Sequence, residues 1–201
     1  MKKIFLLFSL IGFLFGLDIK KAYYDSYNYE KMQDYKDAIK VLIPVYNQYP
    51  NGYTLNLRLG WLFFLSKQYQ NALVHYRRAS LISSFAIEPK LGMLKVYINL
   101  GDYDNALKIG DVILKEDYYN YYGNYYMILA LKGKNEIKTA INLVDKMLVL
   151  YPTSTLFLVQ LGELYFNIDK NKSKEIFENV LILDPNNVVA KDYLNLFKEQ
   201  K

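Results

Sequence analysis

A short phrase that returns every 34 residues constrains this chain more than any other feature. Each copy ends in an alanine, and the four alanines are Ala38, Ala72, Ala106 and Ala140. In the first three copies a tyrosine precedes the alanine, namely Tyr35, Tyr69 and Tyr103. A fixed period of this length is typical of helix–turn–helix repeats. The period therefore predicts a stack of helix pairs in which each repeat packs only against its neighbours.

The period divides the chain into five repeats and a tail. The repeats are residues 19–52, 53–86, 87–120, 121–154 and 155–187. The last repeat is one residue short, and we expect the loss in its turn at residues 169–172, because loops tolerate deletions. Residues 188–201 predict a C-terminal capping helix, which a solenoid end needs. Its expected apolar side is Val189, Tyr193, Leu196 and Phe197.

Small residues and prolines predict where helices cross and end. The alanines stand where the two helices of a pair cross closely, and Gly60 and Gly162 have the same role on first helices. Replacing Ala72 with leucine should overpack its crossing, at a cost of about 1–3 kcal/mol. Pro44 lies inside a second helix, which it should kink or split. The prolines that follow second helices and end them are Pro50, Pro152 and Pro185.

The N-terminus predicts export. Lys2 and Lys3 are followed by an almost wholly apolar run at residues 4–15 and then by Gly16. A basic start, a short apolar run and a small residue are typical of a secretory signal peptide, so we interpret residues 1–16 as one that is cleaved after Gly16. The run is shorter than a bilayer-spanning helix requires, although an uncleaved anchor is the alternative. Either interpretation puts the body of the protein outside the cytoplasm, and we expect a bacterial periplasmic address.

Composition excludes several classes of site. The chain has no cysteine, which excludes disulfides, thiolate metal sites and a cysteine nucleophile. The formal charge of +5 falls to +3 once Lys2 and Lys3 leave with the signal peptide. That excess is spread along the chain, whereas nucleic-acid binders cluster their basic residues. We therefore expect no nucleic-acid partner.

The sequence also argues against catalysis. The only histidine, His75, stands on the second helix of the second repeat, beside Tyr76 and two arginines. A metal site of histidines and cysteines needs more than one such ligand. General-base chemistry needs a positioned nucleophile and an acid, and no motif supplies them. We therefore interpret His75 as a surface residue and predict no catalytic residue, no metal site and no cofactor.

The repeats resemble those of the tetratricopeptide-repeat superfamily, in an exported bacterial form. The second repeat carries the Leu-Gly pair, the alanine and the aromatic positions of the family pattern, at Leu59, Gly60, Phe63, Ala72 and Tyr76. The resemblance covers roughly residues 19–185. It implies an all-α fold, a right-handed superhelical solenoid of five helix pairs plus the C-terminal cap helix. It also implies that the first helices line a concave groove, which receives peptides or partner helices.

The family pattern gives candidate groove residues on the first helices. The residues that we single out as partner-binding are Tyr23, Tyr27, Leu57, Trp61, Phe64, Lys95, Tyr122 and Tyr125. One subgroup of the family grips a C-terminal carboxylate with lysine and asparagine at such positions. Only Lys95 fits that pattern here, so we reject this mode and expect an aromatic and apolar groove. Trp and Tyr are frequent in binding hot spots, although packing between neighbouring helices is the alternative role for each aromatic residue.

A cluster of tyrosines spans the turn into the fourth repeat. Its members are Tyr118, Tyr119, Tyr121, Tyr122, Tyr125 and Tyr126. Tyrosines can stack on sugar rings or line a peptide channel, and they can also simply pack helices with a wet rim. The sequence leaves these roles open.

These patterns predict a non-catalytic adaptor in the bacterial cell envelope. Its groove would bind a peptide or helix of another envelope protein, with Trp61, Phe64, Tyr27 and Tyr125 as contact residues. One alternative is a glycan- or peptidoglycan-binding module built on the tyrosine cluster. Another is a structural spacer subunit of an envelope complex. We predict no membrane span after signal cleavage, and the sequence does not indicate an oligomeric state.

Overall fold

The prediction of an all-α solenoid is confirmed. A computed structural model describes residues 17–199, so the predicted signal peptide lies outside the described residues. Every regular element in that range is a helix. In chain order the helices are α1 (Ile19–Lys31), α2 (Tyr35–Lys40), α3 (Ile43–Gln48), α4 (Tyr53–Leu65), α5 (Tyr69–Ile82), α6 (Ile87–Leu100), α7 (Tyr103–Glu116), α8 (Tyr121–Gly133), α9 (Ile137–Leu150), α10 (Thr155–Tyr165), α11 (Lys170–Leu183) and α12 (Val188–Glu199).

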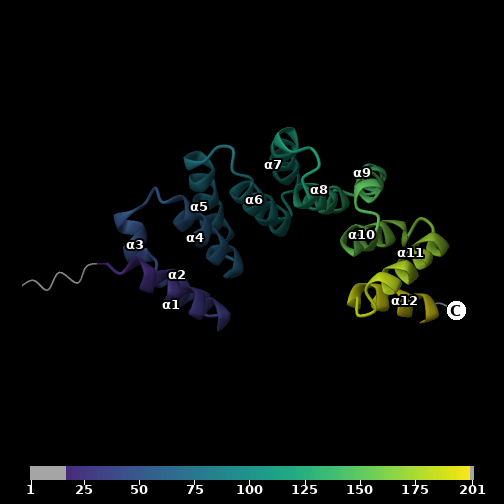
Figure 1. Cartoon of the computed structure of the whole chain (residues 1–201). Helices are drawn as coiled ribbons and strands as arrows, with labels where there is room; N and C mark the ends of the chain where they lie inside the picture. The colour runs from purple at the N-terminus through teal and green to yellow at the C-terminus, as the bar shows by residue number, and fades with distance from the viewer. Residues whose placement is uncertain (1–16, 200–201) are drawn as a thin grey trace, which may run out of the picture.

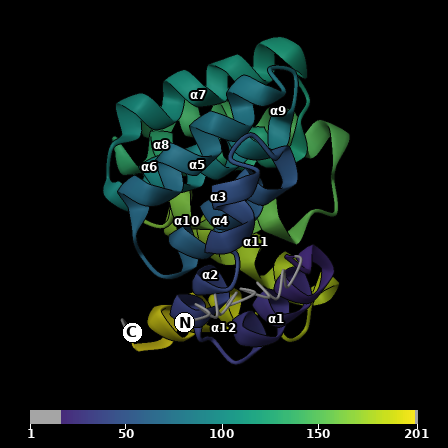
Figure 2. The ribbon, with the colours of Figure 1, turned by 90° about the vertical axis from the view of Figure 1, so that its left-hand side faces the viewer.

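The helices follow one another along an arch (Figure 1). One end of the arch consists of α1 and α2, and the other end consists of α11 and α12. The second helices α7 and α9 lie on the outer side of the arch, and the first helices α8 and α10 lie on the inner side, as Figure 2 also shows. First helices therefore form the concave face, which is where the fold presents side chains to a partner.

The small residues of the repeat stand at close helix crossings, as predicted. The anchoring alanines Ala38, Ala72, Ala106 and Ala140 are completely buried. A methyl group added at Gly60 would lie 2.7 Å from the ring of Tyr76, and one added at Gly162 would lie 2.7 Å from the ring of Phe177. These glycines therefore leave the space that an aromatic side chain of the second helix fills.

The turn inside each of the first four pairs contains one left-handed residue at the same place. These residues are Gln33 (φ 61°), Lys67 (φ 59°), Gly101 (φ 71°) and Asn135 (φ 61°). A glycine adopts this conformation without strain, whereas a residue with a Cβ does not. Among the described residues the shortened fifth repeat has no such residue in its turn. Its missing residue therefore coincides with the loss of the left-handed turn. That turn lies at residues 166–169, and the predicted range 169–172 is wrong because Lys170 already begins α11.

Pro44 divides the second helix of the first repeat, as the sequence predicts. The segment forms two short helices, α2 and α3, with Pro44 in the first turn of α3. Proline has no backbone N–H to donate, and its ring excludes the carbonyl of the preceding turn. A first helical turn tolerates both effects, so the chain starts a new helix there.

A polar side chain at the fourth residue of the first helix joins neighbouring repeats. In α4 this residue is Asn56, whose Nδ2 donates to the backbone oxygens of Pro50 (2.8 Å) and Gly52 (2.9 Å). In α8 Asn124 makes the corresponding two bonds to the turn before it, at 3.1 Å and 2.9 Å. The side chain thus ties the connection between two repeats to the first turn of the following helix.

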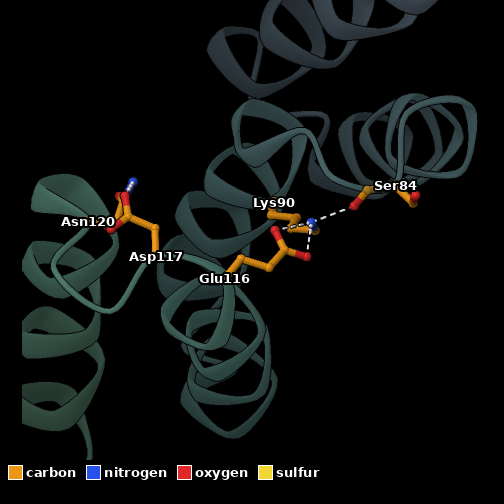
Figure 3. A network of polar contacts seen from close by, with 5 residues as sticks. All are labelled: Ser84, Lys90, Glu116, Asp117 and Asn120. Atoms are coloured by element: carbon orange, nitrogen blue, oxygen red, sulfur yellow. Dashed lines mark hydrogen bonds and ion pairs between the residues drawn. The ribbon is translucent and has the colours of Figure 1, made fainter.

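The same place in α6 holds Lys90 (Figure 3). Its buried ammonium donates to the backbone oxygen of Ser84 (2.6 Å) and to both carboxylate oxygens of Glu116 in α7 (2.8 Å each). Next to it, Asn120 donates a 3.0 Å bond to Asp117. A buried cation is stable only when it is paired and hydrogen-bonded, and Lys90 meets both conditions. It therefore ties the second and third repeats together.

The packed side of the capping helix differs from our prediction. Ala190 is completely buried, and Tyr193 stacks on Phe177 with ring centroids 4.6 Å apart. Val189 and Leu196 are instead exposed. The residues that pack on the fifth repeat are Ala190, Tyr193, Leu194 and Phe197. The prediction is therefore right for Tyr193 and Phe197 and wrong for Val189 and Leu196, because the packed face is centred on Ala190 and Leu194 instead.

Candidate functional site

A groove of about 690 Å³ crosses the first helices of three consecutive repeats. We term it the first groove. Its lining comes from α1, α4, α5 and α6 and consists of Tyr27, Glu30, Lys31, Thr54, Leu57, Arg58, Trp61, Tyr76, Glu88, Leu91, Gly92 and Lys95. A cleft of roughly 300–1,000 Å³ with apolar walls and a few polar groups is typical of ligand sites.

Arg58 organises the α1 side of the first groove. Its guanidinium lies 3.8 Å from the ring centroid of Tyr27, pairs with the carboxylate of Glu30 and donates a 3.1 Å bond to Ser26 Oγ. The second oxygen of Glu30 accepts a 2.7 Å bond from Trp61 Nε1. Glu30 therefore fixes Arg58 and Trp61 together, so that the indole enters the groove in one orientation.

Tyr76 reaches the floor of the groove from α5 because two glycines make room for it. A methyl group at Gly92 would lie 2.5 Å from the Tyr76 ring, and the ring also fills the space opposite Gly60. Gly92 is the sixth residue of its helix, and the same place in the other first helices holds Tyr24, Arg58, Tyr126 and Gln160. Only the third repeat leaves this place without a side chain, and the Tyr76 ring occupies the space beside it.

The first groove carries more charge than the aromatic and apolar surface that we expected. Charged residues in its lining are Glu30, Lys31, Arg58, Glu88 and Lys95. Glu88 accepts a 2.5 Å hydrogen bond from the hydroxyl of Tyr53 in α4. Burial and this carboxylate raise the pKa of Tyr53 to about 12. The groove therefore combines apolar walls with a small number of oriented polar groups.

Solved structures identify the fold of this chain. A tetratricopeptide repeat protein from Parabacteroides merdae ATCC 43184 aligns with a TM-score of 0.74 at 20% identity, covering 87% of this chain and 70% of that one. MamA from Desulfovibrio magneticus RS-1 aligns with a TM-score of 0.71 at 16% identity, covering 84% and 96%. The chain has the tetratricopeptide-repeat fold.

Identities this low establish the fold alone. A thermophilic TPR protein of Thermus thermophilus gives the same result, with a TM-score of 0.70 at 12% identity and coverage of 88% of this chain and 97% of that one. Neither protein-family models nor curated proteins match the sequence. The function of this tetratricopeptide-repeat stack therefore depends on the side chains that it presents.

The tetratricopeptide-repeat stack distributes the predicted partner-binding residues over several environments. Those that line the first groove are Tyr27, Leu57, Trp61 and Lys95. Phe64 does not line it, because its ring lies behind Trp61 (centroids 5.8 Å apart) and packs against the core. Tyr23 also packs against a core cluster, and Tyr122 is exposed on α8 outside the groove.

Tyr125 lines a second, smaller hollow of about 400 Å³, which we term the second hollow. Its lining comes mainly from α8 and α10 and consists of Tyr125, Lys132, Thr155, Leu156, Val159, Gln160, Glu163, Asn187 and Val189. Lys132 crosses it and donates to Gln160 Oε1 (2.7 Å) and Glu163 Oε2 (2.6 Å). The charges of Lys132 and Glu163 thus satisfy each other within this hollow.

The six clustered tyrosines do not form one platform. Tyr118 and Tyr119 lie before α8, where the Lys146 ammonium stands 3.3 Å from the Tyr118 ring centroid. Tyr121 packs edge-on against Phe157, with centroids 4.9 Å apart. Tyr122 is exposed, and its ring lies edge-on to that of Tyr121 (centroids 5.3 Å apart) and stacks on that of Tyr126 (6.5 Å). The cluster is therefore divided between exposed rings and rings that pack against the core.

His75 is buried, so our interpretation of it as a surface residue is wrong. Its ring stacks on Phe63 with centroids 5.2 Å apart, and its Nδ1 lies 3.0 Å from Asn56 Oδ1. Because Nδ2 of Asn56 already donates to backbone carbonyls, its oxygen accepts from the imidazole. Burial, and then the charge of Arg78, lower the pKa of His75 to about 4. The neutral imidazole is therefore part of the hydrogen-bond network through which Asn56 joins the first and second repeats.

Sequence reasoning missed four residues that shape the first groove: Glu30, Arg58, Tyr76 and Gly92. The pairing of Glu30 with Arg58 joins two repeats and has no local sequence pattern. Gly92 did carry a signal, because a glycine inside a helix costs about 1 kcal/mol relative to alanine and needs a packing reason.

Residues 17–199 lack two further kinds of feature. No group of three or more histidine, aspartate or glutamate side chains within this range could hold a metal ion. No helix within it is both long enough and apolar enough to cross a bilayer.

Proposed function

We propose that this chain is a non-catalytic scaffold that holds a peptide or helix of another protein in the first groove. The observation that carries the proposal is the groove itself, which three consecutive first helices form around the oriented indole of Trp61. Curved helical solenoids bind partners along their concave face. A tryptophan presented in a concave apolar cleft is a typical anchor of protein interfaces.

The side chains around the groove support binding more than chemistry. Arg58 and Glu30 neutralise each other and hold the indole in place. His75, the only histidine of the chain, is buried and hydrogen-bonded to Asn56, away from the groove lining. Leu91 belongs to the groove lining but to none of the buried core clusters of the described residues, so its apolar surface is free for a partner.

Photocrosslinking in the native cell tests the proposal. A photoreactive amino acid replaces Thr54, an exposed residue in the groove lining, and in a matched control it replaces Thr139, which is exposed on α9. We expect one dominant protein adduct from position 54 and none from position 139. Equal labelling from both positions, or none from position 54, would favour the spacer alternative.

A pair of leucine variants tests whether the groove surface is the binding surface. Leu91→Lys puts a charge into the groove lining, whereas Leu81→Lys puts the same charge on a side chain that is 85% exposed outside the groove. We expect the first variant to lose the adduct at position 54 and the second to keep it, with both proteins folded by circular dichroism. Retention of the adduct in Leu91→Lys would contradict the assignment.

We further propose that the scaffold acts in the bacterial cell envelope on another envelope protein. The signal peptide predicted at residues 1–16 supports this address. A fusion of alkaline phosphatase to the C-terminus of the whole chain tests it, because that enzyme is active only after export. We expect activity from the full chain and none after deletion of residues 1–16. Activity without that segment would refute the predicted signal.

A further inference from the structure

Lys95 is a cation of the first groove without a counter-ion among residues 17–199. Its ammonium stands 4.9 Å from the ring centroid of Trp61 in α4 and 5.8 Å from that of Tyr126 in α8. None of the hydrogen bonds or ion pairs within that range involves this ammonium. Burial lowers the pKa of Lys95, since no carboxylate offsets the lost hydration. By contrast, Arg58 in the same groove pairs with Glu30.

Tyr76 adds an unpartnered hydroxyl to the same groove. The side chain is only 3% exposed, yet it belongs to the groove lining. The carbon that bears its hydroxyl lies 2.5 Å from the position of a Cβ on Gly92, one helical turn before Lys95. Within the described part of the chain no hydrogen bond involves this hydroxyl. Its oxygen is not among the buried unpaired atoms of the described residues, so the hydroxyl opens onto the groove, where a ligand can accept its hydrogen bond in place of water.

We propose that the bound segment carries an acidic side chain among apolar residues, and that its carboxylate accepts from the Lys95 ammonium and the Tyr76 hydroxyl. This inference rests on the proposed function. Lys31, Arg58 and Lys95 give the groove lining a net charge of +1 against Glu30 and Glu88. A carboxylate complements that charge, whereas an amide of the same shape does not. The apolar neighbours of the acid lie against Leu57 and Leu91.

The acid belongs to a side chain within the segment rather than to the end of the partner chain. Lys95 has an aromatic ring on both sides, because Trp61 comes from the preceding repeat and Tyr126 from the following one. A segment that contacts both rings passes Lys95 and continues in both directions along the first helices. The carboxylate therefore enters from the side of the segment.

Selection from random peptides displayed on phage tests the inference. The library is selected on the wild-type protein, on Lys95→Met and on the control Lys138→Met, which removes an exposed lysine of α9 outside the groove. We expect peptides from the wild type and the control to be enriched in one Asp or Glu flanked by apolar residues. Peptides from Lys95→Met should lack that enrichment.

Selected peptides are then synthesised with a C-terminal amide and measured in solution. Replacing the acid by its amide should weaken binding to the wild type about tenfold, and binding to Lys95→Met hardly at all. Tyr76→Phe should weaken binding of the acidic peptide by a smaller factor. Loss of binding on C-terminal amidation alone would contradict the side-chain assignment.

The outcomes separate this inference from the proposed function. Peptides without an acid that bind the wild type and fail on Leu91→Lys would overturn the inference and leave the groove as the binding site. Acidic peptides that bind wild type and Lys95→Met equally would also overturn it, since the attraction would lie elsewhere. A wild-type protein that selects no peptide dependent on Leu91 would overturn the proposed function as well.

Discussion

The first groove and the second hollow lie on the same concave face, and both contain a lysine from a first helix. In the second hollow, Lys132 is bonded to Gln160 and Glu163, so its charge is used inside the protein. In the first groove, Lys95 lies between two aromatic rings without such a partner among the described residues. A paired charge joins helices, whereas an unpaired one is available to a ligand. Lys132 thus holds repeats together, whereas Lys95 is the group that, under the proposed function, recognises a partner.

The largest effect on stability is expected at Arg58, which joins the first two repeats on the groove side. Arg58→Met should lower the free energy of unfolding by about 3 kcal/mol, because it leaves Glu30 half-buried without its cation. Urea denaturation of the whole chain measures this change. An unchanged urea midpoint would mean that the pairing of Arg58 with Glu30 does not stabilise the folded protein.

The two lysines test the comparison directly. Lys132→Met should cost about 1–2 kcal/mol, because Gln160 and Glu163 lose their donor. Lys95→Met should cost no stability, since it removes a cation whose pKa burial lowers and keeps a chain of similar length beside the rings. Urea denaturation of both variants provides the measurement. Equal losses in the two variants would refute the distinction between a joining and a recognising lysine.

His75 should make the second repeat sensitive to acid. Its pKa is 6.5 in an unfolded chain and about 4 in the folded one, so the unfolded chain binds the proton more readily between these values. The free energy of unfolding should thus fall by about 1 kcal/mol from roughly pH 7 to roughly pH 5, after allowance for solvent screening. The control His75→Leu, which copies Leu143 at the same place in the fourth repeat, should lack this part of the pH dependence. If the free energies of unfolding of the wild type and of His75→Leu change equally with pH, the assignment of this pH dependence to His75 is wrong.

The smallest effect concerns the turns. Lys67 adopts a left-handed conformation (φ 59°) at the place where the third repeat has Gly101. Lys67→Gly should raise the free energy of unfolding by about 0.5–1 kcal/mol, since glycine adopts this conformation without strain. Lys67→Ala keeps the strain and is the control. Thermal unfolding of the two variants provides the measurement. If both variants are more stable than the wild type, the loss of the lysine side chain is the cause and not the relief of backbone strain.

Features that depend on local sequence were predictable. The alanines, the split helix at Pro44 and the shortening of the fifth repeat follow from the repeat period and from backbone chemistry, although the fifth turn lies at residues 166–169 and not at the predicted 169–172. Each is decided within one helix pair, which is why a single sequence predicts them. The capping helix was predicted as an element, together with Tyr193 and Phe197 of its packed face. Whether Ala190 or Val189 turns inward was not, because the contact with the fifth repeat decides it.

Features that join separate repeats were not predictable. Arg58 and Glu30 stand in different repeats, and no pattern links them before the helices are stacked. His75 was assigned to the surface because its neighbours in the chain are charged, whereas its partner Asn56 lies across the helix pair. Trp61 and Lys95 were found because their positions on first helices follow the repeat. Whether Lys95 was paired depended on side chains of other repeats.

The position of Trp61 gives the protein an optical reporter. It is the only tryptophan in the chain, and its indole lines the groove, donates to Glu30 and lies under the Lys95 ammonium. Fluorescence excited selectively in tryptophan therefore reports on one wall of the first groove. It needs no label, and the other four repeats contribute no tryptophan emission. A ligand that displaces water from the indole, or draws Lys95 away from it, shifts the emission maximum and changes the intensity of the tryptophan fluorescence.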